Sequence, residues 1–186
     1  DEFDTMENGC KQLIVWNPES EEIIGGYRYI FGRDWQIDAK GQPKLATSHM
    51  FHFSEKFMRE YAPYTVELGR SFVSLDYQNV RKNTKSIFAL DNLWDGLGAL
   101  TVLNPNVKYF FGKITMYPSM NKTARDYILY FYKKHFPDTE GLVFPKESVE
   151  IETDKNLLVK LFSGTNYKTD NKILVTNVRA LKQNIQ

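Results

Sequence analysis

The order of apolar and polar residues predicts strands and helices that alternate along most of the chain. Strands are predicted where short runs of apolar, β-branched and aromatic residues lie between turn residues. These runs are residues 11–16, 23–31, 64–75, 107–117 and 148–151. Helices are predicted where apolar residues recur every three or four positions. These segments are residues 54–61, 87–102, 123–135, 154–162 and 172–182.

The first two strands predict a hairpin, because a polar turn at 19–22 joins them, and the glycines at 25–26 suggest a bulge in the second strand. The polar segment 33–48 predicts a loop, and Thr123–Asp126 has the spacing of a capping box at a helix start. Strands that alternate with helices after a hairpin indicate a mixed sheet with helices on both faces. We therefore expect an α/β fold and, at 186 residues, a single domain.

The strand predicted at 64–75 carries two opposite charges, Glu67 and Arg70, with Gly69 between them. A regular strand would place the two charges on opposite faces of the sheet. A β-bulge at Gly69 would bring them to the same face. Because an isolated charge inside a sheet is costly, the pair indicates one of two arrangements. It is either a salt bridge at a strand edge or a charged pair in a cleft where sheet pairing breaks.

Three further charged residues join this group of candidates. Arg28 lies inside the strand predicted at 23–31, where a guanidinium needs a carboxylate partner or a wet cavity. Taken alone, it fits an arginine whose head group reaches solvent at a strand edge. Asp1 and Asp4 lie in a loop, where solvated turn residues are the usual explanation. If all these residues converge, the arginines would neutralise the carboxylates.

Composition and charge narrow the classes of function. The formal net charge of +1 argues against nucleic-acid binding driven by overall charge. The single cysteine, Cys10, excludes an internal disulfide framework, and the three histidines lack metal-ligand spacing, so no metal site is expected. Apolar runs stay short of the roughly 20 residues that cross a bilayer, and no signal peptide opens the chain. We expect a cytoplasmic location.

A basic loop at 78–86 precedes the helix predicted at 87–102 and carries Arg81, Lys82 and Lys85. Free N–H groups and the helix dipole at such a helix start favour a bound phosphate. The loop lacks the glycine-rich sequence of a dinucleotide or P-loop site. The three residues fit a phosphate-binding loop or, more commonly, a solvated basic loop.

Several blocks of sequence, taken in order, resemble one known family. They are Asp1-Glu-Phe-Asp4, Cys10-Lys-Gln-Leu-Ile-Val15, Gly25-Gly-Tyr-Arg-Tyr-Ile30, Glu67-Leu-Gly-Arg-Ser-Phe-Val73, Leu93-Trp-Asp-Gly96, Phe110-Phe-Gly-Lys113 and the segment from Ala124-Arg125 to His135-Phe136. Over residues 1–140 the chain resembles the GNAT-like N-acyltransferases of aminolipid synthesis, which include ornithine and glycine N-acyltransferases often labelled hemolysin-like. The blocks within residues 1–15, 25–30 and 67–73 are also similar to those of acyl-homoserine-lactone synthases.

The resemblance implies a GNAT-like three-layer α/β/α fold with a mixed central sheet, in which residues 1–186 form one acyltransferase domain shortened at one or both ends. It implies transfer of a fatty acyl group from acyl carrier protein to the α-amine of an amino acid. Acyl-phosphopantetheine on the carrier protein, or acyl-CoA, would be the co-substrate, with no tightly bound cofactor. A peripheral membrane contact is compatible with this function. The alternatives are a non-catalytic module that binds acyl carrier protein or lipid, and an acyl-homoserine-lactone synthase.

The resemblance also assigns roles to residues. Carried over by position, the family's charged active-site cluster falls on Asp1, Asp4, Arg28, Glu67 and Arg70. An α-amine with a pKa of about 8 is mostly protonated at neutral pH, so a base must accept a proton. We expect Glu67 to be that base. Arg28 and Arg70 would hold the cluster and bind the acceptor's carboxylate.

The donor is expected to meet two other parts of the chain. Backbone N–H groups at the Gly69 bulge would polarise the thioester oxygen. Arg81, Lys82 and Lys85 would meet the phosphopantetheine phosphate or an acidic carrier protein. Aromatic residues make up 15% of the chain, and some of these rings would line an acyl tunnel while most fill an ordinary core.

Overall fold

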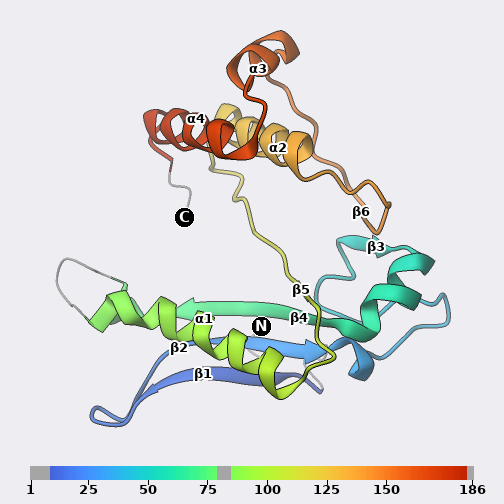
Figure 1. Cartoon of the computed structure of the whole chain (residues 1–186), viewed down its shortest axis with the longest axis vertical. Coiled ribbons are helices and arrows are strands. Elements are labelled where there is room, and N and C mark those ends of the chain that lie inside the picture. Colours follow the sequence, from blue (N-terminus) through green and yellow to red (C-terminus); the bar gives the residue numbers. More distant parts are fainter. Residues whose placement is uncertain (1–8, 79–84, 184–186) are drawn as a thin grey trace. The chain divides into compact units, whose positions relative to one another are not determined.

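The structure is a computed structural model that describes residues 9–78 and 85–183, with the backbone alone described at 85–90. The chain divides into two compact units. Unit 1 contains residues 1–113 and 142–146, and unit 2 contains residues 114–141 and 147–186. Figure 1 labels the helices and strands of both units.

Most of the predicted elements are present. The strands are β1 (Lys11–Asn17), β2 (Glu22–Phe31), β3 (Phe51–Phe53), β4 (Thr65–Val73), β5 (Tyr109–Phe111) and β6 (Val143–Pro145). The α-helices are α1 (Lys85–Leu103), α2 (Lys122–His135), α3 (Lys155–Leu161) and α4 (Tyr167–Ala180). Short turns of other helix types are η2 (Gly32–Asp34), η3 (Phe57–Tyr61), η4 (Ala62–Tyr64) and η5 (Leu75–Tyr77).

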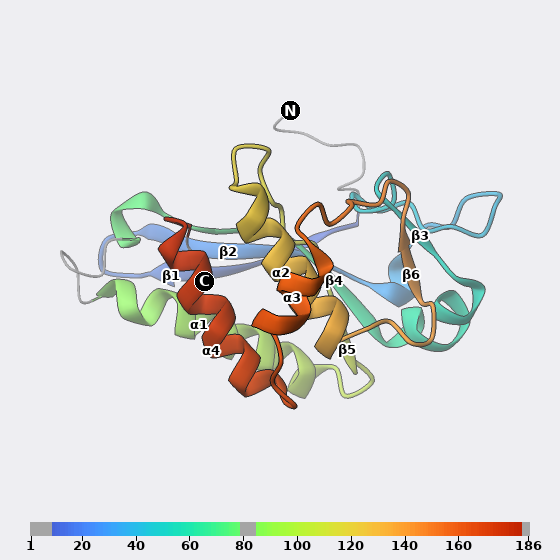
Figure 2. The same cartoon turned by 90° about the horizontal axis from the view of Figure 1, so that it is seen from above.

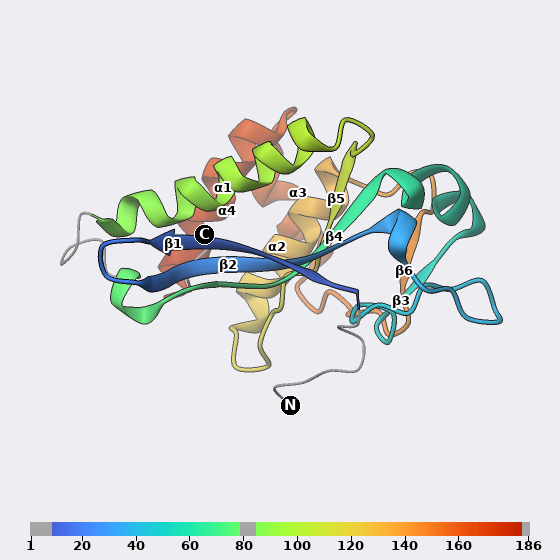
Figure 3. The same ribbon diagram turned by 90° about the horizontal axis from the view of Figure 1, so that it is seen from below.

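Unit 1 is built on a four-stranded sheet in the order β1-β2-β4-β5. Strand β2 pairs antiparallel with both β1 and β4, whereas β5 pairs parallel to β4. Figure 3 shows β1, β2 and β4 running side by side. The parallel pair needs a long crossover, which α1 supplies. The predicted α/β fold with a mixed sheet is therefore confirmed.

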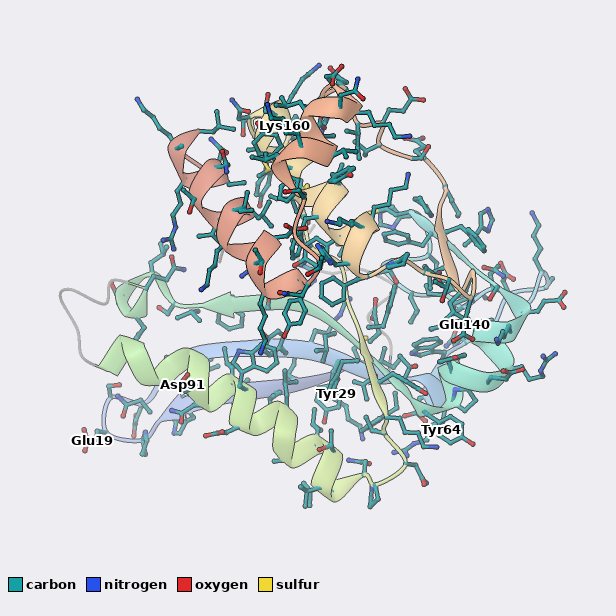
Figure 4. The ribbon with its side chains drawn as sticks, turned by 45° about the horizontal axis from the view of Figure 1, so that its top comes forward. Glu19, Tyr29, Tyr64, Asp91, Glu140 and Lys160 are labelled. Carbon is teal, nitrogen blue, oxygen red and sulfur yellow. The ribbon has the colours of Figure 1, made fainter. Side chains whose placement is uncertain are left out.

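Helix α1 covers one face of this sheet. Leu97 and Leu100 of α1 pack into a cluster with Phe31 and Val66 of the strands. Tyr29, labelled in Figure 4, packs against the same cluster. Because side chains alternate along a strand, these residues identify the face of β2 and β4 that α1 buries. The neighbouring residues Arg28 and Glu67 belong to the other face.

The other face of the sheet meets a cluster rich in aromatic rings at one end. Ile30 of β2 packs there with Trp35, Phe53 and Phe57, and Phe111 of β5 packs against the cluster. The Phe53 and Phe111 rings meet edge to face, with centroids 5.4 Å apart. These rings fill a core, which is the commoner use that the sequence predicted for most of the aromatic residues.

The predicted loop at 33–48 is held in a defined path by side-chain hydrogen bonds. The Gln42 side chain donates to the Phe53 carbonyl and accepts from the Phe53 N–H, at 3.0 and 2.9 Å. Asp38 accepts from the N–H groups of Lys40 and Gln42. The end of this loop therefore reaches the sheet in a fixed position, with Thr47 only 2% exposed.

Unit 2 is a small helical unit in which α2 and α4 lie side by side (Figures 1 and 2). Its core contains Ile128 and Phe131 of α2, Phe162 at the end of α3, and Leu174 and Val178 of α4. No helix among residues 9–78 and 85–183 combines the length and hydropathy needed to cross a bilayer.

Two carboxylates are buried in unit 2. Asp126 accepts hydrogen bonds from the backbone N–H groups of Glu152 and Thr153. Asp170 accepts from Lys134 Nζ and contacts His135 Nε2, each at 2.7 Å. Both carboxylates join segments that are far apart in the sequence.

Four details of the sequence prediction are wrong. The strand predicted at 107–117 is reduced to β5, since the chain leaves the sheet after Phe111. The strand predicted at 148–151 is absent from the described residues, and β6 forms a few residues earlier against β3. Helix α4 starts at Tyr167 rather than 172, because Asn166 caps it. Asn121, not Thr123, caps α2, since its side chain accepts from the Ala124 N–H.

Candidate active site

The predicted bulge in β4 is present, immediately after Gly69. Arg28 of β2 pairs with Gly69, and Gly26 pairs with Phe72, so two steps along β2 match three along β4. The extra residue lies at 70–71, and Arg70 has a left-handed φ of 45°. This conformation costs a residue other than glycine roughly 1–2 kcal/mol. The bulge thus interrupts the regular pairing of β4 with β2 just beyond the buried charges.

Glu67 lies at the centre of the candidate site and is only 1% exposed. Its Oε2 is 3.6 Å from Nη2 of Arg28, which is itself 4% exposed. Its Oε1 accepts a hydrogen bond of 3.1 Å from the Thr47 hydroxyl. The sheet register explains the first contact, because Arg28 and Glu67 lie on one face of neighbouring strands. Each carboxylate oxygen of Glu67 therefore contacts a side chain, Oε2 that of Arg28 and Oε1 that of Thr47.

Gly69 has a role that the sequence did not predict. A Cβ atom at position 69 would lie 2.6 Å from Nη2 and 3.2 Å from Cζ of Arg28. The guanidinium thus lies directly over the glycine, in the space that a side chain would fill. The absence of a Cβ lets Arg28 reach Glu67 along the surface of the sheet.

We expect Gly69→Ala to push the Arg28 guanidinium away from Glu67 and to lower the free energy of unfolding by about 1–3 kcal/mol, the usual cost of overpacking. Urea unfolding measures this change. The matched control is Gly98→Ala in α1, where an added Cβ meets no atom within 4 Å. That control should stabilise the helix by roughly 0.5–1 kcal/mol. Equal effects of the two substitutions would contradict the close contact.

Burial raises the pKa of Glu67 above that of an ordinary glutamate. The Arg28 charge, the Thr47 hydrogen bond and the Lys113 charge act in the opposite direction but do not cancel the effect. A carboxylate with a raised pKa is a stronger base when ionised. The environment of Glu67 therefore suits proton transfer better than that of a solvent-exposed glutamate.

The Thr47 hydroxyl can be tested directly. Thr47→Val keeps the shape of the side chain but removes the donor, so the pKa of Glu67 should rise further. Thr47→Ser keeps the hydroxyl and should restore the wild-type titration. Carbon-13 NMR of the Glu67 carboxyl across pH measures both variants. A titration that is the same in wild type and Thr47→Val would show that the hydrogen bond does not act on Glu67.

The other predicted site residues fall in different places. Arg70 is exposed at the bulge, whereas the buried ion pair of Glu67 is made with Arg28. Lys85 begins α1, but its side chain is outside the described residues. Asp1, Asp4, Arg81 and Lys82 also lie outside the described residues. Their predicted roles therefore stay predictions.

Sequence reasoning missed two residues near Glu67. Thr47 lies 20 positions away, in a segment predicted only as a loop. Lys113 follows β5 and is close enough for its charge to lower the pKa of Glu67. The Phe110–Lys113 block contributes to the family resemblance, but its pattern gives no indication of a charge that acts on the base. No group of three or more potential metal ligands occurs among the described side chains.

Strand β5 pairs with β4 only from Thr65 to Glu67. Beyond Glu67, no strand in the described part of the chain pairs with this edge of β4. An open strand edge presents backbone N–H and C=O groups to a ligand. The buried carboxylate thus lies at the point where the pairing of the two parallel strands stops.

Comparison with known proteins finds one family model and two relatives that are similar to the chain. Residues 1–85 match the family model described as the acetyltransferase (GNAT) domain. Over 185 residues, the chain is 63% identical to a protein of Phocaeicola vulgatus and 62% identical to one of Bacteroides thetaiotaomicron. Both are named glycine N(alpha)-acyltransferase. No solved structure matches the chain significantly.

These alignments cover 100% of this chain but only 57% and 55% of the two relatives. The chain thus spans little more than half the length of the curated relatives that it matches. Residues 1–85 carry the match to the acetyltransferase (GNAT) domain, and the α/β fold with its mixed sheet is consistent with that match.

Proposed function

We propose that the protein is an N-acyltransferase that moves a fatty acyl group from acyl carrier protein to the α-amine of an amino acid, in aminolipid synthesis. The observation that carries the proposal is the buried Glu67, paired with Arg28 and Thr47 where β5 leaves β4. The names of the two relatives support glycine as the acceptor. The donor and the pathway come from the family resemblance.

The reaction joins an amine to a thioester carbonyl. The amine nitrogen forms a bond to the carbonyl carbon, the carbon–sulfur bond breaks, and the thiol leaves. An acceptor that arrives as an ammonium loses two protons in all: the Glu67 carboxylate accepts one, directly or through a water molecule, and the departing sulfur takes up the other to leave as the thiol. Glu67 acts only when ionised, so its raised pKa places the acid limb of activity above the range of an ordinary glutamate.

Arg28 holds the base in place. Its guanidinium is buried and lies within 3.6 Å of Glu67, so it neutralises the carboxylate rather than reaching out to the acceptor. The sequence predicted two roles for Arg28, holding the charged cluster and binding the acceptor's carboxylate. We propose only the first of these roles. Arg70, Asp1 and Asp4 remain proposed members of the charged cluster.

The open edge of β4 suits the arm of the donor. Phosphopantetheine contains amide groups that can hydrogen-bond to a strand edge, as an extended peptide does. The edge becomes free beyond Glu67, which would bring the thioester close to the base. Backbone N–H groups at the bulge can then polarise the thioester oxygen. Arg81, Lys82 and Lys85 are proposed to meet the phosphate or the acidic carrier protein.

One assay tests the proposal. The protein is incubated with acyl carrier protein carrying a fatty acyl group and with single amino acids, and intact-mass detection identifies N-acyl products. N-acylglycine in the highest yield is the expected result. A homoserine-lactone product would favour the signal-synthase alternative. Absence of any acylated product, with acyl-CoA as donor as well, would favour a non-catalytic module.

The setting of the reaction is part of the same proposal. We place the protein in the cytoplasm with a peripheral contact to the membrane that receives its product. Co-sedimentation with vesicles of anionic lipid tests the membrane contact separately from catalysis.

A further inference from the structure

Lys113 is an exposed cation beside the proposed base. It follows β5 by two residues, and the last residue of β5, Phe111, pairs with Glu67 of β4. Within the described residues, the Lys113 ammonium makes one hydrogen-bond contact, at 3.9 Å to the Met50 thioether sulfur. Sulfur is a weak acceptor, so this contact leaves the ammonium available for an anion.

A short chain of contacts links Lys113 to Glu67. Met50, which Lys113 touches, donates its backbone N–H to the Thr47 carbonyl at 3.0 Å. The Thr47 hydroxyl donates to Glu67 at 3.1 Å. The charge of Lys113 also lowers the pKa of Glu67, which requires the two groups to be within electrostatic reach. The Lys113 ammonium therefore contacts the same segment, residues 47–50, that places the Thr47 hydroxyl against Glu67.

Neighbouring cations are already engaged. Arg28 is buried against Glu67. Lys146, which contacts the same loop, donates its Nζ to the Ser48 carbonyl at 2.7 Å. Among these three basic residues, Lys113 alone is exposed, has a charge that acts on Glu67 and, within the described residues, donates only to a weak sulfur acceptor.

We propose that the Lys113 ammonium binds the carboxylate of the amino-acid acceptor while the acceptor's amine lies at Glu67. The inference rests on the proposed function and names the residue that selects α-amino acids over plain amines. An α-amino acid carries its amine and carboxylate on one carbon, so a cation close to the base can hold both groups in place. The charge-assisted contact also raises the concentration of acceptor at the thioester.

The kinetic test compares glycine with glycinamide, which has the amine but no carboxylate. Wild type is expected to prefer glycine in kcat/KM, and Lys113→Met should reduce this preference about tenfold through a higher KM for glycine. The KM for glycinamide should stay unchanged. Lys113→Arg keeps a cation and should retain most of the preference. Rates are compared above the acid limb of Glu67, because removal of Lys113 also raises the pKa of that carboxyl.

Lys146→Met is the matched control, since it removes another exposed lysine that contacts the same loop. It should leave the preference for glycine unchanged. An unaltered preference in Lys113→Met would overturn the proposal. An equal loss in Lys146→Met would also overturn it, because the effect would then come from general surface charge.

A binding measurement separates this inference from the proposed catalysis. Glycine is titrated into the protein without a donor, and amide NMR shifts near Lys113 and Glu67 are followed. Wild type should bind glycine at least about tenfold more tightly than Lys113→Met. Binding of this kind without acylation would contradict the proposed function but support the carboxylate site. Equal binding by the two proteins, or no binding to wild type, would overturn the carboxylate site whatever the activity.

Discussion

Glu67→Gln is expected to lower kcat by about 10²–10⁴-fold, which is the usual contribution of a general base. Glutamine has the same shape and can still accept from the Thr47 hydroxyl, but it cannot take a proton from the amine. The expected change is in kcat rather than in KM, since the base acts in the transition state. Single-turnover acylation of glycine measures the chemical step directly.

The pH profile provides a second readout for the same residue. Burial raises the pKa of Glu67, so wild-type activity should fall as pH drops through this raised value. The variant should lose this limb and keep the limb that belongs to the amine acceptor. Glu60→Gln is the control, because Glu60 is exposed and pairs only with its neighbour Arg59 among the ion pairs of the described residues. Unchanged turnover in Glu67→Gln would remove Glu67 from the mechanism.

Asp170→Asn is expected to lower the free energy of unfolding of unit 2 by about 3 kcal/mol, because it removes one partner of a buried ion pair. Asp170 is fully buried, and its Oδ2 contacts both Lys134 and His135 at 2.7 Å. Its Oδ1 also accepts from the Gly164 N–H at 2.9 Å. The substitution loosens the junction between α2, α4 and the segment after α3.

Hydrogen exchange of α2 and α4 measures this loss in unit 2 itself. The three tryptophans at 16, 35 and 94 all belong to unit 1, so their fluorescence follows the other unit. Glu152→Gln is the control, since that carboxylate is 56% exposed in its ion pair with Lys122. It should cost well under 1 kcal/mol. Equal protection of wild type and Asp170→Asn would contradict the buried-pair argument.

The same carboxylate predicts how the stability of unit 2 depends on pH. Burial tends to raise the pKa of Asp170, but the hydrogen bonds from Lys134, His135 and Gly164 outweigh it and hold the pKa below the ordinary value. Asp170 therefore contributes stability above the pKa of the unfolded state, and this contribution is lost as pH falls through the folded-state pKa. Acid unfolding of Asp170→Asn should lack this part of the transition.

Local patterns in the sequence were sufficient for most elements. The hairpin of β1 and β2, strand β4, and helices α1, α2 and α3 follow from apolar periodicity and turn residues, which act over a few neighbouring positions. The same local reading failed for β5. Its apolar run continues past Phe111, yet the pairing with β4 stops at that residue. Whether an apolar run joins a sheet depends on its contacts with the neighbouring strand, and the periodicity of the run carries no information about that strand.

The candidate site shows the same division. Because a buried charge is costly alone, the sequence by itself determined that Glu67 and Arg28 need partners, and it placed a bulge near Gly69. Only the tertiary structure decided that Arg28, rather than Arg70, pairs with Glu67, and that Thr47 and Lys113 lie beside it. The register between β2 and β4 and the path of a long loop set these contacts. They join residues that are 20 to 46 positions apart along the chain, beyond the range of any local pattern.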